Sequence, residues 1–252
     1  MISGILITVT IAAMAWLPKA AALSELHYDL YSETTTTTYF SGVVNQNRLR
    51  VLYPAFGFKV LPYLGVNTSG DYTNSGSVRY ADNYVSPTAG LLLKPWSFLG
   101  LFAEYRRLYR TDTNSGRLPK EEDDPRYGAY AYFSKPLPVP SIPHVEVYGE
   151  SVALGRYSSQ PVSTAWLKLG KELSLSPLWS ATPYLEAFLR ESPDLLIGVD
   201  ERSLRFGGKL KWQHGGWAAQ LLAYRRFQSS SVPNGWEALL VLSADGGAQE
   251  WN

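Results

Sequence analysis

Residues 203–212 read Ser-Leu-Arg-Phe-Gly-Gly-Lys-Leu-Lys-Trp, and alternate positions of this stretch differ in kind. One set holds Leu204, Phe206, Gly208, Leu210 and Trp212; the other holds Ser203, Arg205, Gly207, Lys209 and Lys211. A β-strand sends successive side chains to opposite faces. The stretch therefore predicts a strand with one apolar face and one cationic face.

The same alternation recurs along most of the chain and predicts twelve strands. They are 25–32, 48–53, 58–69, 84–93, 97–110, 126–133, 144–157, 163–173, 180–190, 203–212, 217–227 and 236–244. An even number of antiparallel strands closes a barrel with both chain ends on one side. The sequence therefore predicts an all-β fold, an antiparallel up-and-down transmembrane β-barrel with lipid outside and a polar lumen. The alternative is a soluble antiparallel sandwich, whose polar face meets water.

The connections between these strands differ in length. The stretches 33–47, 70–83 and 111–125 are long and polar, whereas 94–96 and 213–216 have the composition of tight turns. Transmembrane barrels have short periplasmic turns and longer outer loops. We therefore expect the long connections, including the acidic run 121–124, to be outer loops.

The N-terminal region has the pattern of a secretory leader. Residues 4–17 are apolar apart from Thr8 and Thr10, and small residues at Ala20 and Ala22 suit a cleavage site. We expect a signal peptide over 1–22 and a mature barrel over 23–252 with a short C-terminal tail. The alternative is a membrane anchor, but the apolar run is shorter than the roughly 18 residues of a spanning helix.

Composition agrees with an exported membrane barrel. The chain has no cysteine, and its 23 basic residues nearly balance 22 acidic ones, so nothing favours binding to nucleic acid. The 8 Trp, 17 Tyr and 9 Phe residues suit aromatic girdles at two lipid–water interfaces. No helical membrane span is expected.

The polar positions of the predicted strands carry most of the charge. A Lys or Arg that faces lipid at the midplane costs roughly 2–4 kcal/mol, so these side chains should point into the lumen and pair there. We expect Glu146 and Glu150 to pair with Lys168 and its neighbours. The predicted lumen residues are Glu104, Arg106, Glu146, Glu150, Lys168, Glu172, Glu186, Arg190, Arg205, Lys209 and Lys211.

The pattern over 25–244 resembles that of bacterial outer-membrane β-barrel proteins. Within that class, stretches 59–66 (KVLPYLGV) and 87–95 (PTAGLLLKP) are similar to the C-terminal barrels of exopolysaccharide-export and phage-adsorption proteins. The resemblance implies location in the outer membrane of a Gram-negative bacterium. Those proteins carry helical repeats before the barrel, and such barrels usually finish on an aromatic residue. This chain has no such repeats and ends Glu250-Trp251-Asn252.

A Tyr-Arg-Arg motif occurs twice, at 105–107 and 224–226, with Arg110 shortly after the first copy. Both copies fall near the outer rim, where consecutive arginines point alternately inward and outward. We expect Arg107 and Arg225 to point outward at headgroup height. Guanidinium groups bind phosphate in a bidentate manner, so our hypothesis is that Arg107, Arg110 and Arg225 hold lipopolysaccharide phosphates. The alternative is an aromatic and basic girdle without a defined site.

No residues are assigned as catalytic, and no metal or other cofactor is expected. The three histidines, His27, His144 and His214, fall near the periplasmic side, and we expect no Ser–His or Asp–His pair. The acidic run 121–124 lacks the spacing of a calcium-binding loop.

The sequence thus predicts a non-enzymatic barrel, structural or transport-associated, with a narrow lumen and outer loops for a protein or polysaccharide partner. One alternative is a porin-like channel for small solutes or oligosaccharides, with Phe102, Tyr148, Trp166, Tyr184 and Phe188 as a stacking track. A second alternative is an outer-membrane enzyme that modifies lipid.

Overall fold

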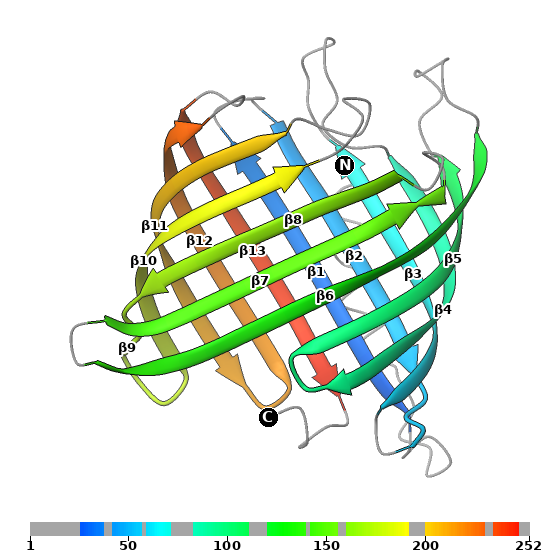
Figure 1. Ribbon diagram of the computed structural model, residues 1–252, viewed down its shortest axis with the longest axis horizontal. Helices are drawn as coiled ribbons and strands as arrows, with labels where there is room; N and C mark the ends of the chain where they lie inside the picture. Colours follow the sequence, from blue (N-terminus) through cyan, green and yellow to red (C-terminus); the bar gives the residue numbers. More distant parts are fainter. Residues whose placement is uncertain are drawn as a thin grey trace.

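The computed structural model is an all-β barrel (Figure 1). It describes residues 26–37, 42–56, 59–71, 83–110, 120–139, 142–155, 160–191, 200–229 and 234–246. The proposed signal peptide and the last six residues lie outside these ranges. The described residues contain no helix that is long and apolar enough to cross a membrane.

Twelve antiparallel strands close the barrel, and a short thirteenth strand is added at one end. The strands are β1 (His27–Thr37), β2 (Gly42–Leu52), β3 (Val60–Asp71), β4 (Tyr84–Trp96), β5 (Leu99–Arg110), β6 (Glu121–Val139), β7 (Ile142–Leu154), β8 (Gln160–Gly170), β9 (Leu173–Ser174), β10 (Trp179–Glu191), β11 (Glu201–His214), β12 (Trp217–Ser229) and β13 (Gly235–Gly246). Each strand of the barrel pairs with the next, β8 pairs with β10, and β13 pairs with β1. The predicted twelve-stranded, up-and-down barrel is confirmed.

The two ends of the barrel differ in the length of their connections. Residues 97–98 and 215–216 form tight turns at one end, and Gly215 there has a φ of 56°, which suits glycine. At the other end, residues 72–83 separate β3 from β4. Because outer-membrane barrels keep their short turns in the periplasm, we call the first end periplasmic and the second outer.

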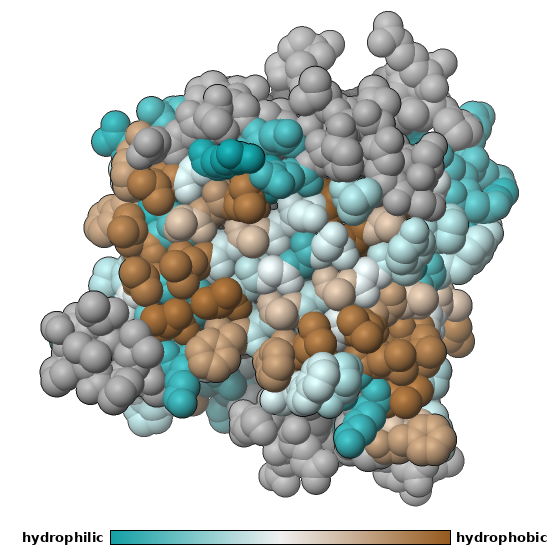
Figure 2. All heavy atoms as spheres, in the orientation of Figure 1, coloured by the Kyte–Doolittle hydropathy of each residue, from teal (hydrophilic) through white to brown (hydrophobic). Residues whose placement is uncertain are grey.

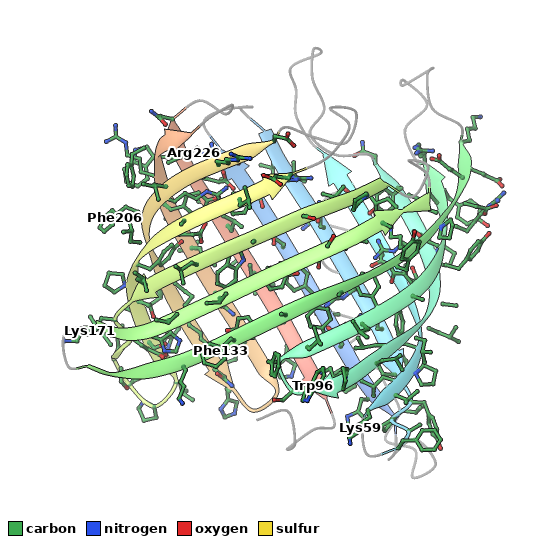
Figure 3. The ribbon with its side chains drawn as sticks, viewed as in Figure 1. Lys59, Trp96, Phe133, Lys171, Phe206 and Arg226 are labelled. Atoms are coloured by element: carbon green, nitrogen blue, oxygen red, sulfur yellow. The ribbon has the colours of Figure 1, made fainter. Side chains whose placement is uncertain are left out.

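The register gives the barrel an apolar outer wall and a polar lumen. On β11, Phe206 is 59% exposed and points away from the barrel, whereas Arg205 beside it is 6% exposed (Figure 3). Large apolar side chains gather in patches on the wall seen in Figure 2. Between those patches the wall is paler in Figure 2. Small residues face one another in the register of β6, β7 and β8, where Ala131 pairs with Gly149 and Gly149 pairs with Ala165. This closed wall places the chain in the bacterial outer membrane, because each of the twelve described barrel strands pairs with a neighbour on both sides.

Several strands are longer than the sequence predicted. The expected loop 33–47 is mostly strand, because β1 runs through the threonines to Thr37 and β2 begins at Gly42. Threonine is β-branched and favours extended backbone. The expected turn 94–96 also belongs to a strand, β4, and the turn follows at 97–98.

The acidic run 121–124 is a second correction, since it forms the start of β6 rather than a loop. Glu122 and Asp124 face the lumen, whereas Glu121 and Asp123 face outward opposite β5. Arginines of β5 pair with these acids on the inner face and on the outer face of the sheet. These ion pairs explain why the hydrogen-bonded pairing of β5 with β6 extends so far. The acids therefore do not converge on one point, and the described residues contain no cluster suited to a metal ion.

An apolar cluster occupies the periplasmic half of the lumen beside β2–β6. It consists of Leu52, Leu61, Tyr63 and Leu92, with Phe102 and Tyr130 packed against it. The Tyr63 ring lies over Gly90, where an added Cβ would come within 2.4 Å of Tyr63 Cζ. The barrel interior on this side is thus filled by side chains rather than lined only by charges.

Candidate functional site in the lumen

A chain of ion pairs runs along the inner face of β8, β10, β11, β12 and β13. Glu186 accepts from Lys168 at 3.1 Å and from Arg205 at 3.0 Å. Arg205 also contacts Glu201 at 3.0 Å, and Glu201 contacts Arg226 at 2.8 Å. Arg226 ends the chain on Glu237 at 3.0 Å. Every one of these charges has an opposite partner, which offsets the cost of removing it from water.

A second group of pairs lies on the next strands around the wall, β1 and β2, and β1 pairs with β13. Asp29 of β1 accepts from both Arg48 and Arg50 of β2, with Arg48 Nη2 3.2 Å from its Oδ2. The Arg50 guanidinium lies 5.1 Å from the centre of the Tyr63 ring. Tyr63 in turn donates to Glu104 at 2.7 Å.

The outer half of β5 and β6 carries a third group. Glu104 Oε1 lies 2.5 Å from Arg106, and Asp124 lies 2.6 Å from Arg126. Both acids are buried, as expected for carboxylates that are held by guanidinium groups. The lumen wall is thus cross-linked over most of its circumference.

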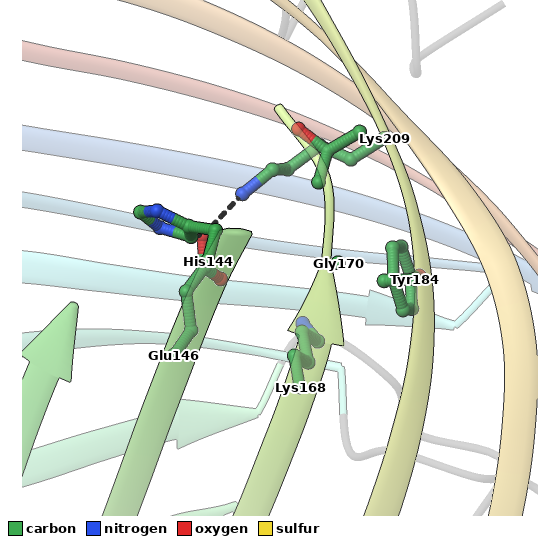
Figure 4. Close-up of a pocket in the computed structure, with 7 residues that line it drawn as sticks. His144, Glu146, Lys168, Gly170, Tyr184 and Lys209 are labelled. Atoms are coloured by element: carbon green, nitrogen blue, oxygen red, sulfur yellow. Dashed lines mark hydrogen bonds and ion pairs between the residues drawn. The ribbon is translucent and has the colours of Figure 1, made fainter. Parts of the chain in front are cut away.

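One ion pair crosses the inner face instead of joining neighbouring strands. Lys209 Nζ of β11 lies 2.6 Å from Glu146 Oε1 of β7, although β8 and β10 separate the two strands (Figure 4). Near it the lumen keeps a small pocket of about 10 Å³ at the periplasmic end, which is roughly the room that one water molecule needs. The pocket is lined by His144, Glu146, Lys168, Gly170, Thr182, Tyr184 and Lys209.

The aromatic residues of the lumen do not form one open track. Tyr148 and Trp166 stack with centroids 5.6 Å apart. Cations cover several of the others: Arg205 lies 3.6 Å from the centre of the Phe188 ring, and Lys168 lies 5.3 Å from that of Tyr184. Phe102 packs against the apolar cluster. Several of these rings therefore make cation–π contacts with charged residues and do not form a continuous stacking surface along the lumen.

The structure places ten of the eleven predicted lumen residues on inward-facing strand positions. Seven of them form the lumen ion pairs described above: Glu104, Arg106, Glu146, Lys168, Glu186, Arg205 and Lys209. Glu150 accepts from Tyr148, while Arg190 and Lys211 face inward by register. Glu172 is the exception, because it lies exposed in the connection between β8 and β9.

The expected pairing of Glu146 and Glu150 with Lys168 and its neighbours differs in detail: Glu146 lies opposite Lys168 in the register, and Lys168 and Lys209 line the same pocket. Lys168 pairs with Glu186 of the neighbouring strand, so Glu146 binds Lys209 instead. Glu150 accepts a hydrogen bond from Tyr148 at 2.6 Å. Strand parity gives the face on which a residue lies, but it does not give the partner.

Sequence reasoning missed several members of the network. They are Asp29, Arg48, Arg50, Glu122, Asp124, Arg126, Glu201, Arg226 and Glu237. Glu122, Asp124 and Glu201 lie where the strands extend beyond the predicted bounds, whereas the other six lie within predicted strands. A signal was present in Arg48 and Arg50, which share one strand face two residues apart.

The expectation of no Ser–His pair is also wrong. Ser134 Oγ lies 2.8 Å from His144 Nε2 near the periplasmic end of the lumen. Glu146 Oε1 lies 3.5 Å from the same nitrogen. In a hydrolytic triad the acid instead contacts the other ring nitrogen and orients the base. This arrangement therefore differs from a triad although the residue types agree.

The three rim arginines lie in different environments. Arg107 faces outward and is held by Asp123 at 2.5 Å and Glu121 at 2.9 Å. Arg110 instead faces the lumen, is nearly buried, and contacts Glu122 at 2.5 Å, so it does not lie on the outer wall beside Arg107. Arg225 faces outward, is exposed, and lies opposite Trp236 in the register.

The comparisons with known proteins yield only structural neighbours. No protein-family model and no curated protein sequence matches the chain. An outer-membrane channel from Pseudomonas putida F1 is 13% identical, covers 87% of this chain and 94% of its own, and gives a TM-score of 0.47. The translocator domain of autotransporter NalP from Neisseria meningitidis is 11% identical, with 96% and 95% coverage and a TM-score of 0.42.

LpxR from Salmonella typhimurium is 9% identical, with 86% and 99% coverage and a TM-score of 0.44. These neighbours are too distant to carry an argument about what the barrel does.

Proposed function

We propose that this chain is a non-enzymatic, transport-associated barrel whose lumen is constricted by ion pairs. The bridge between Lys209 and Glu146 carries the proposal, because it joins strands that are not neighbours. On the other side, the apolar cluster around Leu61 and Tyr63 fills part of the interior. Side chains from both sides therefore narrow the passage, which supports the movement of small polar solutes only.

Single-channel recording in planar bilayers tests the constriction. We expect the wild-type barrel to show only a small conductance, because the constriction admits ions and small polar solutes alone. Replacing both bridge residues, as Glu146→Ala with Lys209→Ala, removes the cross-lumen contact without leaving an unpaired charge. This variant should show a several-fold larger conductance.

The matched control is Arg107→Gln, which removes a charge from the outer wall and should leave conductance unchanged. A large, stable open level in the wild-type barrel would contradict the proposal.

We also propose that the outer rim binds lipopolysaccharide and that Arg225 is the residue that contacts its phosphates. Arg225 has no anionic partner among the described residues, whereas Arg107 is already held by two acids. Exposed aromatic side chains surround Arg225, with Phe206 and Trp236 opposite it on the neighbouring strands. A protein or polysaccharide partner would bind the outer connections.

A hydrolase is the second candidate function, since Ser134 and His144 lie within hydrogen-bond distance. The main proposal predicts no turnover of short-chain nitrophenyl esters by the purified barrel, because among the described residues no carboxylate orients His144 from its other nitrogen. Turnover that disappears in Ser134→Ala would replace the transport proposal with a hydrolytic one. The activity of a matched Ser163→Ala variant, on the outer wall, would show that the loss is specific.

A further inference from the structure

The lumen pocket at the periplasmic end lies beside a surplus of positive charge. Lys168 and Lys209 line the pocket, whereas Glu146 is the one carboxylate of the described chain that lines it. Glu146 pairs with Lys209. Lys168 pairs with Glu186, which also pairs with Arg205. Lys211 occupies the next inward position of β11, one step closer to the periplasm, and has no acidic partner among the described residues. An ion that enters from this end therefore meets cations first.

The same pocket contains a hydroxyl that lacks a partner. Tyr184 is 3% exposed and lines the pocket, and its Oη has no hydrogen-bond partner among the described residues. Buried polar groups are nearly always hydrogen-bonded, so an orphaned hydroxyl of this kind requires an explanation. Thr182, also buried, brings a second hydroxyl to the pocket.

The backbone holds these groups close together. Tyr184 pairs with Gly170 of β8 in the register, and Gly170 pairs with His144 of β7. A Cβ at Gly170 would lie 2.9 Å from the Thr182 methyl group, so only glycine lets the strands carry these side chains so near one another. The result is a compact set of hydroxyl and ammonium donors at one place on the lumen wall.

We propose that this pocket binds a small oxyanion, a carboxylate or phosphate group, held by Lys209 Nζ and the Tyr184 hydroxyl, with Lys211 attracting it from the periplasmic side. Both contacts are donors, and charge-assisted hydrogen bonds to an anion are the stronger kind. Glu146 contacts Lys209 when no anion is present, and its displacement by the oxyanion makes the room that the anion needs in this small pocket. The inference rests on the proposed transport function and names the class of solute for it.

Calorimetric titration of the full-length barrel in detergent tests the site. The probes are inorganic phosphate, D-glucuronate, and D-glucose as an uncharged control. We expect at least one of the two anions to bind, and glucose not to bind. Binding of phosphate indicates a free anion, whereas binding of glucuronate alone indicates an acidic sugar. Absence of binding by both anions, or equal binding of glucose, would overturn the proposal.

Two variants of the bridge should have opposite effects. Lys209→Gln removes a donor and should weaken anion binding about tenfold, as expected for one charged hydrogen bond. Glu146→Gln removes the competing carboxylate and should strengthen binding. If both variants weaken binding alike, the bridge is merely structural and the proposal is wrong.

Further variants keep the test independent of folding defects. Tyr184→Phe removes only the orphaned hydroxyl and should weaken binding, whereas Lys171→Gln, at an exposed lysine of the same end, should not. Unchanged affinity in Tyr184→Phe would contradict the assigned contact. The titration does not depend on conductance: a wide pore would refute the constriction alone, and a closed lumen without anion binding would refute this site alone.

Discussion

Single arginines at the outer rim differ in whether an acid already holds them. Among the described residues no acid contacts Arg225, which leaves it able to contact a lipid phosphate, so Arg225→Gln should lower the lipopolysaccharide that copurifies with the barrel several-fold. Arg107→Gln should leave it nearly unchanged, because Asp123 and Glu121 already bind that side chain. The measurement is lipopolysaccharide per mole of purified protein. If wild type and Arg225→Gln retain equal amounts of lipopolysaccharide, the rim is an aromatic and basic girdle without a defined binding site.

Individual strands show how far alternation predicts structure. On β11 one face is apolar and meets lipid, whereas the other face carries the charged residues of the lumen. Alternation this clear allowed the sequence to predict both the architecture and the number of barrel strands. On β3 the alternation is hidden, since Leu61 and Tyr63 join the lumen cluster while Leu64 and Val66 face outward. On β2 the outer wall itself turns polar at Asn45 and Asn47, which conceals the strand that carries Arg48 and Arg50.

The whole barrel adds what no single strand specifies, namely which inward charges meet. Glu146 and Lys209 are 63 residues apart and lie on strands that do not pair. Their contact depends on the curvature of the closed wall, so sequence reasoning placed both in the lumen but chose another partner for Glu146. The two ends of the molecule also differ, with the pocket and Lys211 at the periplasmic end and the rim arginines at the outer end.

Oxygen accessibility of spin labels along β11 tests the closed, lipid-facing barrel most directly. The chain has no native cysteine, so single cysteines at Leu204, Phe206 and Leu210 or at Ser203, Lys209 and Lys211 each carry one label. In reconstituted bilayers we expect high accessibility to lipid-dissolved oxygen at the first three positions and low accessibility at the others, which gives a period of two residues. Uniform accessibility, or the opposite phase with Lys209 in contact with lipid, would contradict a closed, lipid-facing barrel.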